Sequence, residues 1–220
     1  MKAFLLRALC VFFACAAMDT FAANLVILTF DDLPGPGAYG SAVPSGYGGF
    51  QWYNFNYLDG TDFTASGYQN GVVSANNVAF NGSSNSAELS SVGPFDLNSA
   101  WLTAAWNDGL QLEVQGFAGG TLLYDQTYTL NAAAPTLLTF NYLGVDEVSF
   151  SSSGGINHGY DGSGTQFVMD NLTVTVPEPS TIGLVIFSAA GVGLVGSRKR
   201  FRNPVGSSCS TMTVSRSATG

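Results

Sequence analysis

No Lys or Arg occurs between residues 24 and 176, and this feature constrains the chain more than any other. All 7 basic residues lie nearer the ends, whereas 13 of the 15 acidic residues, all but Asp19 and Glu178, fall inside the stretch. A domain without cations cannot pair its acids with Lys or Arg, bind nucleic acid phosphates through basic side chains, or clamp anionic substrates. We therefore expect no nucleic acid partner. The carboxylates must be hydrated, hydrogen-bonded or bound to cations from outside.

The same stretch is typical of short β-strands separated by Gly- and Asn-rich turns. Charged residues make up only 10% of the chain, too few for the outer faces of helical bundles or coiled coils, and an aromatic content of 13% argues against disorder. Leu110–Gln115 alternates apolar and polar residues, and Gly119-Gly120 then predicts a hairpin with 121–130. Further strands are expected at 24–30, 50–57, 136–142, 146–151 and 166–176. The pattern predicts an all-β fold, an antiparallel β-sandwich of the jelly-roll kind, over residues 23–176.

Residues 1–22 are typical of a secretory signal peptide. Lys2 and Arg7 form a basic start, residues 8–17 are apolar, and Ala22 ends a segment with small residues where signal peptidase cleaves. Cys10 and Cys15 would leave with this segment, and residues 24–176 contain no cysteine. The exported domain must therefore be stabilised by its core, without a disulfide.

The C-terminal part predicts a membrane segment. Pro177-Glu178-Pro179 is followed by an apolar, glycine-rich run from Thr181 to Gly196, and then by the basic cluster 198–202. The run is near the lower length limit of a transmembrane helix, and the basic cluster places its end in the cytoplasm. The residues from 203 to 220 are rich in Ser and Thr, which predicts a disordered tail.

The order of motif, apolar helix and basic cluster over residues 177–202 resembles the PEP-CTERM sorting signal of exported bacterial proteins. The resemblance implies processing by exosortase, a membrane protease, with Pro177, Glu178 and Pro179 as the sorting motif. It also implies a Gram-negative bacterium that makes exopolysaccharide, transient anchoring in the inner membrane, and a final place at the cell surface or outside the cell. An ordinary single-pass anchor after a Pro linker is the alternative.

A looser resemblance concerns the exported domain itself. Residues 100–120, which contain Trp101 and Trp106, together with 167–172, are similar to recurrent ectodomains of PEP-CTERM proteins. Those ectodomains resemble galactose-binding-like and carbohydrate-binding-module jelly rolls. The resemblance implies this fold, and it makes sugar binding and a structural calcium ion reasonable expectations.

Three carboxylates form a candidate calcium site. Asp31 and Asp32 end the first expected strand, and Asp170 lies in the last. Because the first and last strands of an antiparallel sandwich are often neighbours, these oxygen atoms could meet, and Ca²⁺ takes six to eight such ligands. A domain rich in acids and without cations would gain stability from such an ion. The alternative is that the three carboxylates are solvated beside turns.

The aromatic segment 50–57 is a candidate sugar-binding strand. Sugars stack on exposed rings with Asp or Asn nearby, which nominates Trp52, Tyr53, Asn54 and Asp59. Rings also occupy both faces of a strand when one face fills the core, and this is the stronger interpretation. Trp101 and Trp106 face the same choice.

Catalysis is not expected. His158 is the only histidine, it lies in a Gly- and Ser-rich segment, and no G-x-S-x-G motif is present. Glu88, Glu113 and Glu147 are the candidates for a glycosidase pair, but no spacing links them. The first hypothesis is thus a non-catalytic protein of the surface or extracellular matrix. A carbohydrate-binding module that recognises an exopolysaccharide is the second, and a secreted glycosidase is the third.

Overall fold

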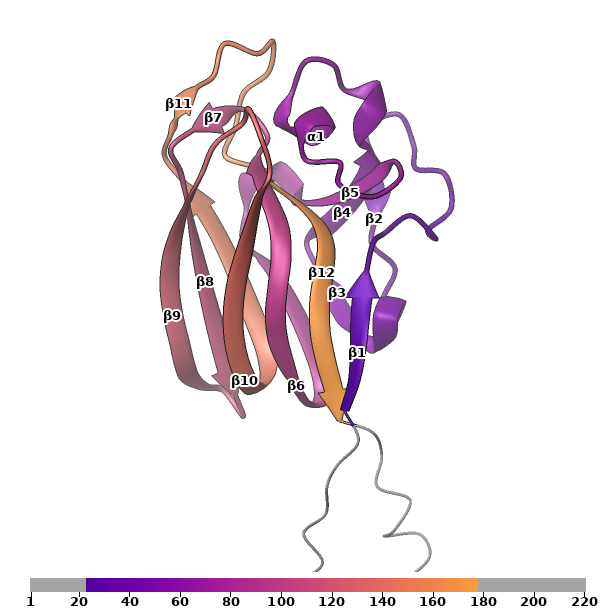
Figure 1. The fold of residues 1–220 in the computed structure, drawn as a ribbon, viewed down its shortest axis with the longest axis vertical. Helices are drawn as coiled ribbons and strands as arrows, with labels where there is room; N and C mark the ends of the chain where they lie inside the picture. Colours follow the sequence, from indigo (N-terminus) through magenta and orange to yellow (C-terminus); the bar gives the residue numbers. More distant parts are fainter. Residues whose placement is uncertain (1–22, 178–220) are drawn as a thin grey trace, which may run out of the picture. The chain divides into compact units, whose positions relative to one another are not determined.

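The computed structural model describes residues 23–177, which form one β-domain (Figure 1). The strands are β1 Ala23–Leu28, β2 Ser41–Ala42, β3 Gln51–Tyr53, β4 Phe55–Asp59, β5 Asn77–Asn81, β6 Ala87–Ala104, β7 Asn107–Asp108, β8 Leu110–Ala118, β9 Thr121–Leu130, β10 Thr136–Ser153, β11 Ile156–Asn157 and β12 Phe167–Pro177. A short helix, α1 Gly67–Asn70, and the 3-10 turns Tyr47–Gly49, Gly60–Asp62 and Gly82–Ser84 lie in the connections. The described domain is therefore all-β, as the sequence predicts.

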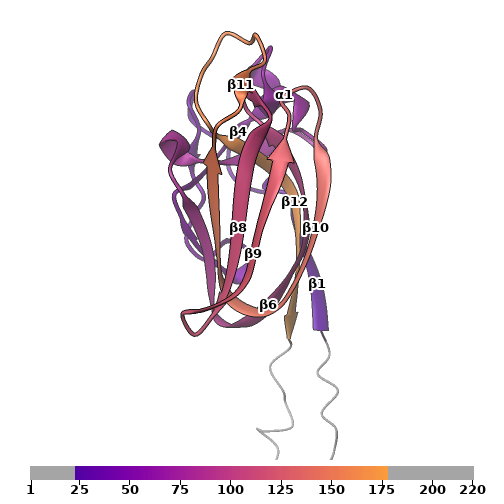
Figure 2. The ribbon, with the colours of Figure 1, turned by 90° about the vertical axis from the view of Figure 1, so that its left-hand side faces the viewer.

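Two long strands, β6 and β10, pair along their length and bend together, which divides the sheet into two layers. The first half of β10 pairs with the second half of β6, and β12 continues that layer towards β1 and β5. After a break in register between Val145 and Glu147, the second half of β10 pairs with β8 on one side and with Ala87–Ser90 of β6 on the other. The second layer thus has the order β3, β6, β10, β8, β9. In Figure 2 the β8–β9 hairpin lies in front and the β6–β10 ribbon turns at the lower end.

Apolar side chains of the two layers meet in the core. Phe150 of the second layer packs against Phe167 of the first with ring centroids 5.8 Å apart, and Tyr124 stacks on Tyr142 at 4.5 Å. In β8, Leu110, Leu112 and Val114 are buried while the residues between them face outward. This burial of alternate residues is the physical basis of the sandwich.

The strand pairing confirms two predictions. The first and last strands are antiparallel neighbours, with Ala23 opposite Pro177, and β8 and β9 form the hairpin around Gly119-Gly120. Both ends of the described chain therefore lie together, at the end opposite α1, β7 and β11 (Figure 1).

Other strands differ from the prediction. The segment 50–57 is divided into β3 and β4 by Asn54, whose φ of 54° breaks the extended backbone. Conversely, 136–142 and 146–151 are parts of the single strand β10, because Gly144 takes a φ of 67° and the ladder resumes after an irregularity. Strand β6 was not expected, since Gly93-Pro94 in its middle reads as a turn.

The expected signal peptide (1–22), the tail (203–220) and all of the sorting segment after Pro177, including Glu178 and Pro179, lie outside the described residues. Within residues 23–177, no helix is long and apolar enough to cross a membrane.

Candidate polysaccharide-binding face

Polar side chains predominate on the outward side of the second layer, here called the polar face, although Phe117 lies there too, opposite Glu147. One row across its five strands consists of Tyr53, Glu88, Ser149, Gln115 and Asp125, each opposite the next in the strand register. The middle three face outward because their strand neighbours Leu89, Val148 and Val114 are buried, and residues directly opposite one another lie on the same side of a sheet. The face is therefore built by two-residue alternation in strands that are distant in the sequence.

A groove crosses the part of this face formed by β10, β8 and β9. It has a volume of about 200 Å³ and is lined by Gln111, Glu113, Thr127, Ser151, Ser152 and Ser153. Ser151 Oγ lies 2.7 Å from Ser86 Oγ, and Gln111 Nε2 donates to the Gly109 carbonyl at 2.9 Å, so both side chains are oriented. Hydroxyl, amide and carboxylate groups thus converge in one concave place, which suits a ligand that both donates and accepts hydrogen bonds.

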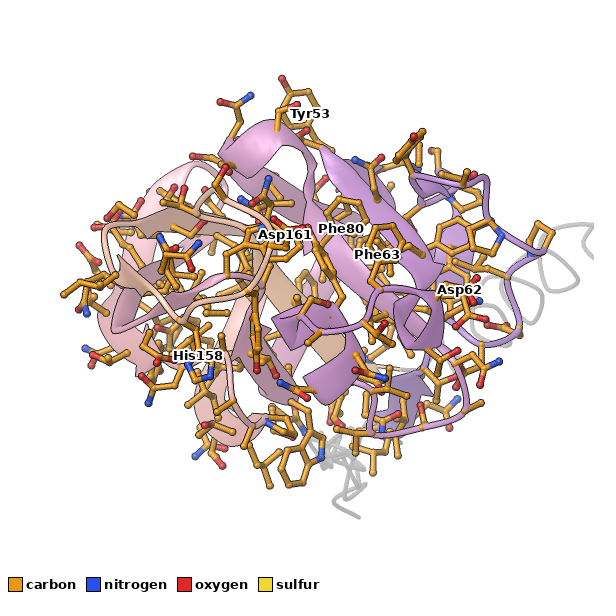
Figure 3. The ribbon with its side chains drawn as sticks, turned by 90° about the horizontal axis from the view of Figure 1, so that it is seen from above. Tyr53, Asp62, Phe63, Phe80, His158 and Asp161 are labelled. Atoms are coloured by element: carbon orange, nitrogen blue, oxygen red, sulfur yellow. The ribbon has the colours of Figure 1, made fainter. Side chains whose placement is uncertain are left out.

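The four residues expected to bind sugar have different roles. Trp52 packs edge-on against Phe55 with ring centroids 5.1 Å apart, and its Nε1 donates to the Tyr47 carbonyl at 2.9 Å. Its neighbour Tyr53 is 67% exposed, lies on the polar face and points away from the molecule in Figure 3. Trp52 therefore belongs to the packed interior, and Tyr53 offers its ring to solvent.

The side chains of Asn54 and Asp59 form hydrogen bonds within turns and are not part of the polar face. The Asn54 amide nitrogen donates to the carbonyls of Gly82, Asn85 and Ser86, at 3.0, 3.2 and 2.9 Å. One Asp59 carboxylate oxygen accepts from the Thr61 N–H at 3.0 Å and caps the following 3-10 turn. Of the predicted sugar-binding residues, the structure places only Tyr53 on the same face as the groove.

Asp170 is a fully buried carboxylate surrounded by hydrogen-bond donors. One of its oxygens accepts from the backbone N–H groups of Val73 and Ser74 at 2.7 and 2.8 Å. The other accepts from the Asn171 N–H at 2.7 Å and lies 3.0 Å from Ser74 Oγ, whose one proton is shared between Asp170 and Asp31. Burial raises the pKa of Asp170, and these donors oppose the rise because they favour the charged form.

The Ser74 hydroxyl links Asp170 to Asp31, whereas Asp32 has a different hydrogen-bond partner. The Ser74 hydroxyl is 2.8 Å from Asp31, whose other oxygen accepts from the Asn76 and Asn77 N–H groups at 3.1 and 2.9 Å. Asp32 accepts instead from the Tyr47 hydroxyl at 2.8 Å. Within residues 23–177, no group of three His, Cys, Asp or Glu side chains is placed to share a metal ion. Because N–H donors fill the lone pairs that a cation would need, these residues do not fit Ca²⁺ well.

A calcium ion at Asp31, Asp32 and Asp170 thus stays a prediction from sequence. The hydrogen bonds indicate instead that protein donors stabilise these carboxylates. We expect calcium and magnesium at matched ionic strength to shift the melting temperature equally, to within about 1 °C, because screening acts alike for both. Thermal unfolding in EDTA, calcium, magnesium and salt measures this. A calcium-specific rise of about 10 °C that disappears in Asp170→Ala would instead establish the site.

His158 and the two tryptophans lie outside the polar face. His158 Nδ1 is 2.5 Å from Asp108, and this hydrogen bond, with that from the Ala132 N–H, lowers the pKa of Asp108. Trp106 packs against Tyr68 at 5.5 Å, and Trp101, which is partly exposed, lies between Asp170 and Leu137 in the first layer. The aromatic and histidine candidates outside β3 therefore stay apart from the groove.

The groove residues were only partly foreseen. The alternation of Leu110–Gln115 predicts an outward Gln111 and Glu113, but no pattern marks Thr127, and Ser152 and Ser153 lie beyond the strand expected at 146–151. In the structure β10 continues to Ser153 because it pairs with β8 as far as Gln111. Of the three glutamates considered for hydrolysis, Glu113 lines the groove, and Glu88 and Glu147 lie on the polar face in other strands.

Comparison with known proteins gives little further information. No family model matches the chain, and no curated protein matches its sequence. Among solved structures, the chain is similar to "TmCBM61 in complex with beta-1,4-galactotriose", with 11% identity and a TM-score of 0.36 over 61% of this chain and 95% of that one.

Proposed function

We propose that this chain is an exported, non-catalytic protein of the cell surface or extracellular matrix that binds an extracellular polysaccharide through the polar face. The observation that carries the proposal is the groove, which is lined by Gln111, Glu113, Thr127 and three serines, of which Ser152 directs its hydroxyl to the Thr165 carbonyl instead. Polysaccharides present rows of hydroxyl groups, which such side chains bind as donors and acceptors.

The exposed ring of Tyr53 supports the same function. It lies on β3, two strands from β10, and neighbouring strands are about 4.8 Å apart, so ring and groove are about 10 Å or more from each other. An oligosaccharide lying across the strands would stack one sugar on Tyr53 and place others in the groove.

The position of the chain ends is compatible with a sorted surface protein. Ala23 and Pro177 are paired at one end of the domain, and the polar face runs along its side. The Pro177-Glu178-Pro179 motif and the apolar run after it support export, temporary anchoring and processing by an exosortase. A domain attached there would keep the polar face accessible.

Loss of the Tyr53 ring tests the proposed binding. We expect Tyr53→Ala to weaken binding to a polysaccharide found on a glycan array by about tenfold, since stacking on an exposed ring contributes about 1 kcal/mol or more. Tyr39→Ala is the matched control, because Tyr39 is 90% exposed and lies outside the polar face. Equal affinities of both variants and the wild type would remove Tyr53 from the site, and a blank array would refute the proposal itself.

Processing of the C-terminus is tested separately. If residues 177–202 act as a sorting signal, the mature protein should lack the apolar run and the basic cluster. Mass spectrometry of the C-terminus in the surface fraction measures this, with Glu178→Ala as the variant expected to accumulate unprocessed. Intact residues 181–202 at the surface would mean a plain membrane anchor.

A further inference from the structure

We infer that the polar face selects polysaccharides that carry protonated amino groups over those that carry uronic acids, with Glu113 as the residue that determines this specificity. The inference rests on the proposed function, and it assigns the ligand class of the same groove. It starts from the distribution of hydrogen bonds among the carboxylates.

Most carboxylates of the domain already accept hydrogen bonds from the protein. Seven of the 13 do so: Asp31, Asp32, Asp59, Asp96, Asp108, Asp146 and Asp170. Among residues 23–177, the side chains without such a bond are Asp62, Glu88, Glu113, Asp125, Glu147 and Asp161. Four of these six, Glu88, Glu113, Asp125 and Glu147, lie on the polar face. Most carboxylates that are free to accept hydrogen bonds from a ligand therefore lie on one surface of the domain.

Glu113 occupies the central place among these four. It lies opposite Ser151 on one side and Thr127 on the other, and all three line the groove. The carboxylate is half-buried and is the only charged group of the groove. A ligand ammonium group would meet an acceptor-only side chain there, with hydroxyls beside it for the neighbouring sugar oxygens.

Because the domain has no Lys or Arg, its charge favours cationic polysaccharides and disfavours anionic ones. Residues 23–177 carry 13 acidic side chains and no Lys or Arg, so no such side chain neutralises Glu113 or pairs with a uronate, and the single histidine, His158, lies beside Asp108. An anionic polymer is repelled by the polar face, a neutral one is unaffected, and a polycationic one is attracted over a distance of about one Debye length. Charge and groove geometry thus favour the same ligand.

The probes that test this are a glucosamine oligomer, its N-acetylated counterpart of equal length, and a galacturonate oligomer. The protein purified after export is titrated with each by calorimetry at about pH 5.5, where amines are protonated. In about 20 mM salt, we expect the glucosamine oligomer to bind about tenfold more tightly than the N-acetylated one, and the galacturonate oligomer most weakly. The preference should fall to about twofold in 0.5 M salt, because ions screen the attraction.

Glu113→Gln keeps the shape of the side chain and removes its charge. We expect it to reduce the preference for the glucosamine oligomer over the N-acetylated one about threefold, as for the loss of a partly exposed ion pair. Asp62→Asn is the matched control, because it removes one unbonded carboxylate that lies away from the polar face (Figure 3). Circular dichroism of both variants checks that they fold.

The outcomes separate the inference from the function on which it rests. Equal or tighter binding of the galacturonate or N-acetylated oligomer would overturn the inference and leave polysaccharide binding intact. The same reduction in Glu113→Gln and Asp62→Asn would also overturn it, since the effect would then be diffuse charge and not a site. If neither these oligomers nor any neutral glycan on an array bound, the proposed function would fail as well.

Discussion

Replacing Asp170 with Asn is expected to lower the free energy of unfolding by about 3 kcal/mol, although the two side chains have nearly the same size. One carboxylate oxygen accepts from two backbone N–H groups, the other accepts from the Asn171 N–H, and Asp170 is fully buried. Whichever oxygen becomes the amide nitrogen, that nitrogen would face a backbone N–H donor. At least one backbone N–H would then lose its acceptor beside a side chain that is itself closed to solvent.

Urea unfolding of the exported protein, followed by tryptophan fluorescence, measures this loss. Ser74→Ala removes only the hydroxyl that joins Asp31 to Asp170, so it should cost less, about 1 kcal/mol. Asp62→Asn, at an exposed position, should stay within about 0.5 kcal/mol of the wild type. A loss below about 0.5 kcal/mol in Asp170→Asn would show that the carboxylate does not hold the 73–77 segment in place.

Truncation of Trp52 is expected to destabilise the domain by about 3 kcal/mol, or about 10 °C in melting temperature. The indole packs between Phe30 and Phe55, with ring centroids 5.7 and 5.1 Å away, and its Nε1 bonds to a backbone carbonyl. Trp52→Ala would leave a cavity beside the core and a carbonyl without its donor. Both losses act on folding and not on ligand binding.

Tyr53→Ala is the control for Trp52→Ala, because the adjacent side chain leaves the same strand in the opposite direction. We expect its melting temperature to stay within about 2 °C of the wild type, while its polysaccharide affinity falls. The opposite result, a stable Trp52→Ala variant that loses only sugar binding, would restore Trp52 to the binding site. The pair thus separates a core ring from a ligand ring with single substitutions.

Much of the fold follows from local patterns. The alternation in Leu110–Gln115 and the Gly-Gly turn predicted the β8–β9 hairpin, because side-chain direction in a strand depends only on residue parity. The pairing of the first and last strands was also predicted. The bent β6–β10 ribbon was not, since its strands bond across Gly93-Pro94 and Gly144, and local sequence marks these as breaks.

The candidate site was predicted less well. Rings on both faces of 50–57 left it open which of them would be buried, and the opposition of Trp52 to the buried Leu89 decided this. The two aspartates Asp31 and Asp170 were expected to approach each other and are joined by Ser74. The donors that surround them come from the 73–77 segment, which has no pattern that points to a carboxylate.

The sequence by itself determined the strand-rich fold, the two-residue alternation of β8 and an acidic domain without Lys or Arg. These are local or additive properties, which do not depend on where the strands lie. Only the tertiary structure decided that Glu113 of β8, Thr127 of β9 and Ser151 of β10 meet in one groove, and that Asp170 is enclosed by backbone donors. Strand order and register bring these residues together, and both are set by the joint burial of apolar side chains from the whole chain.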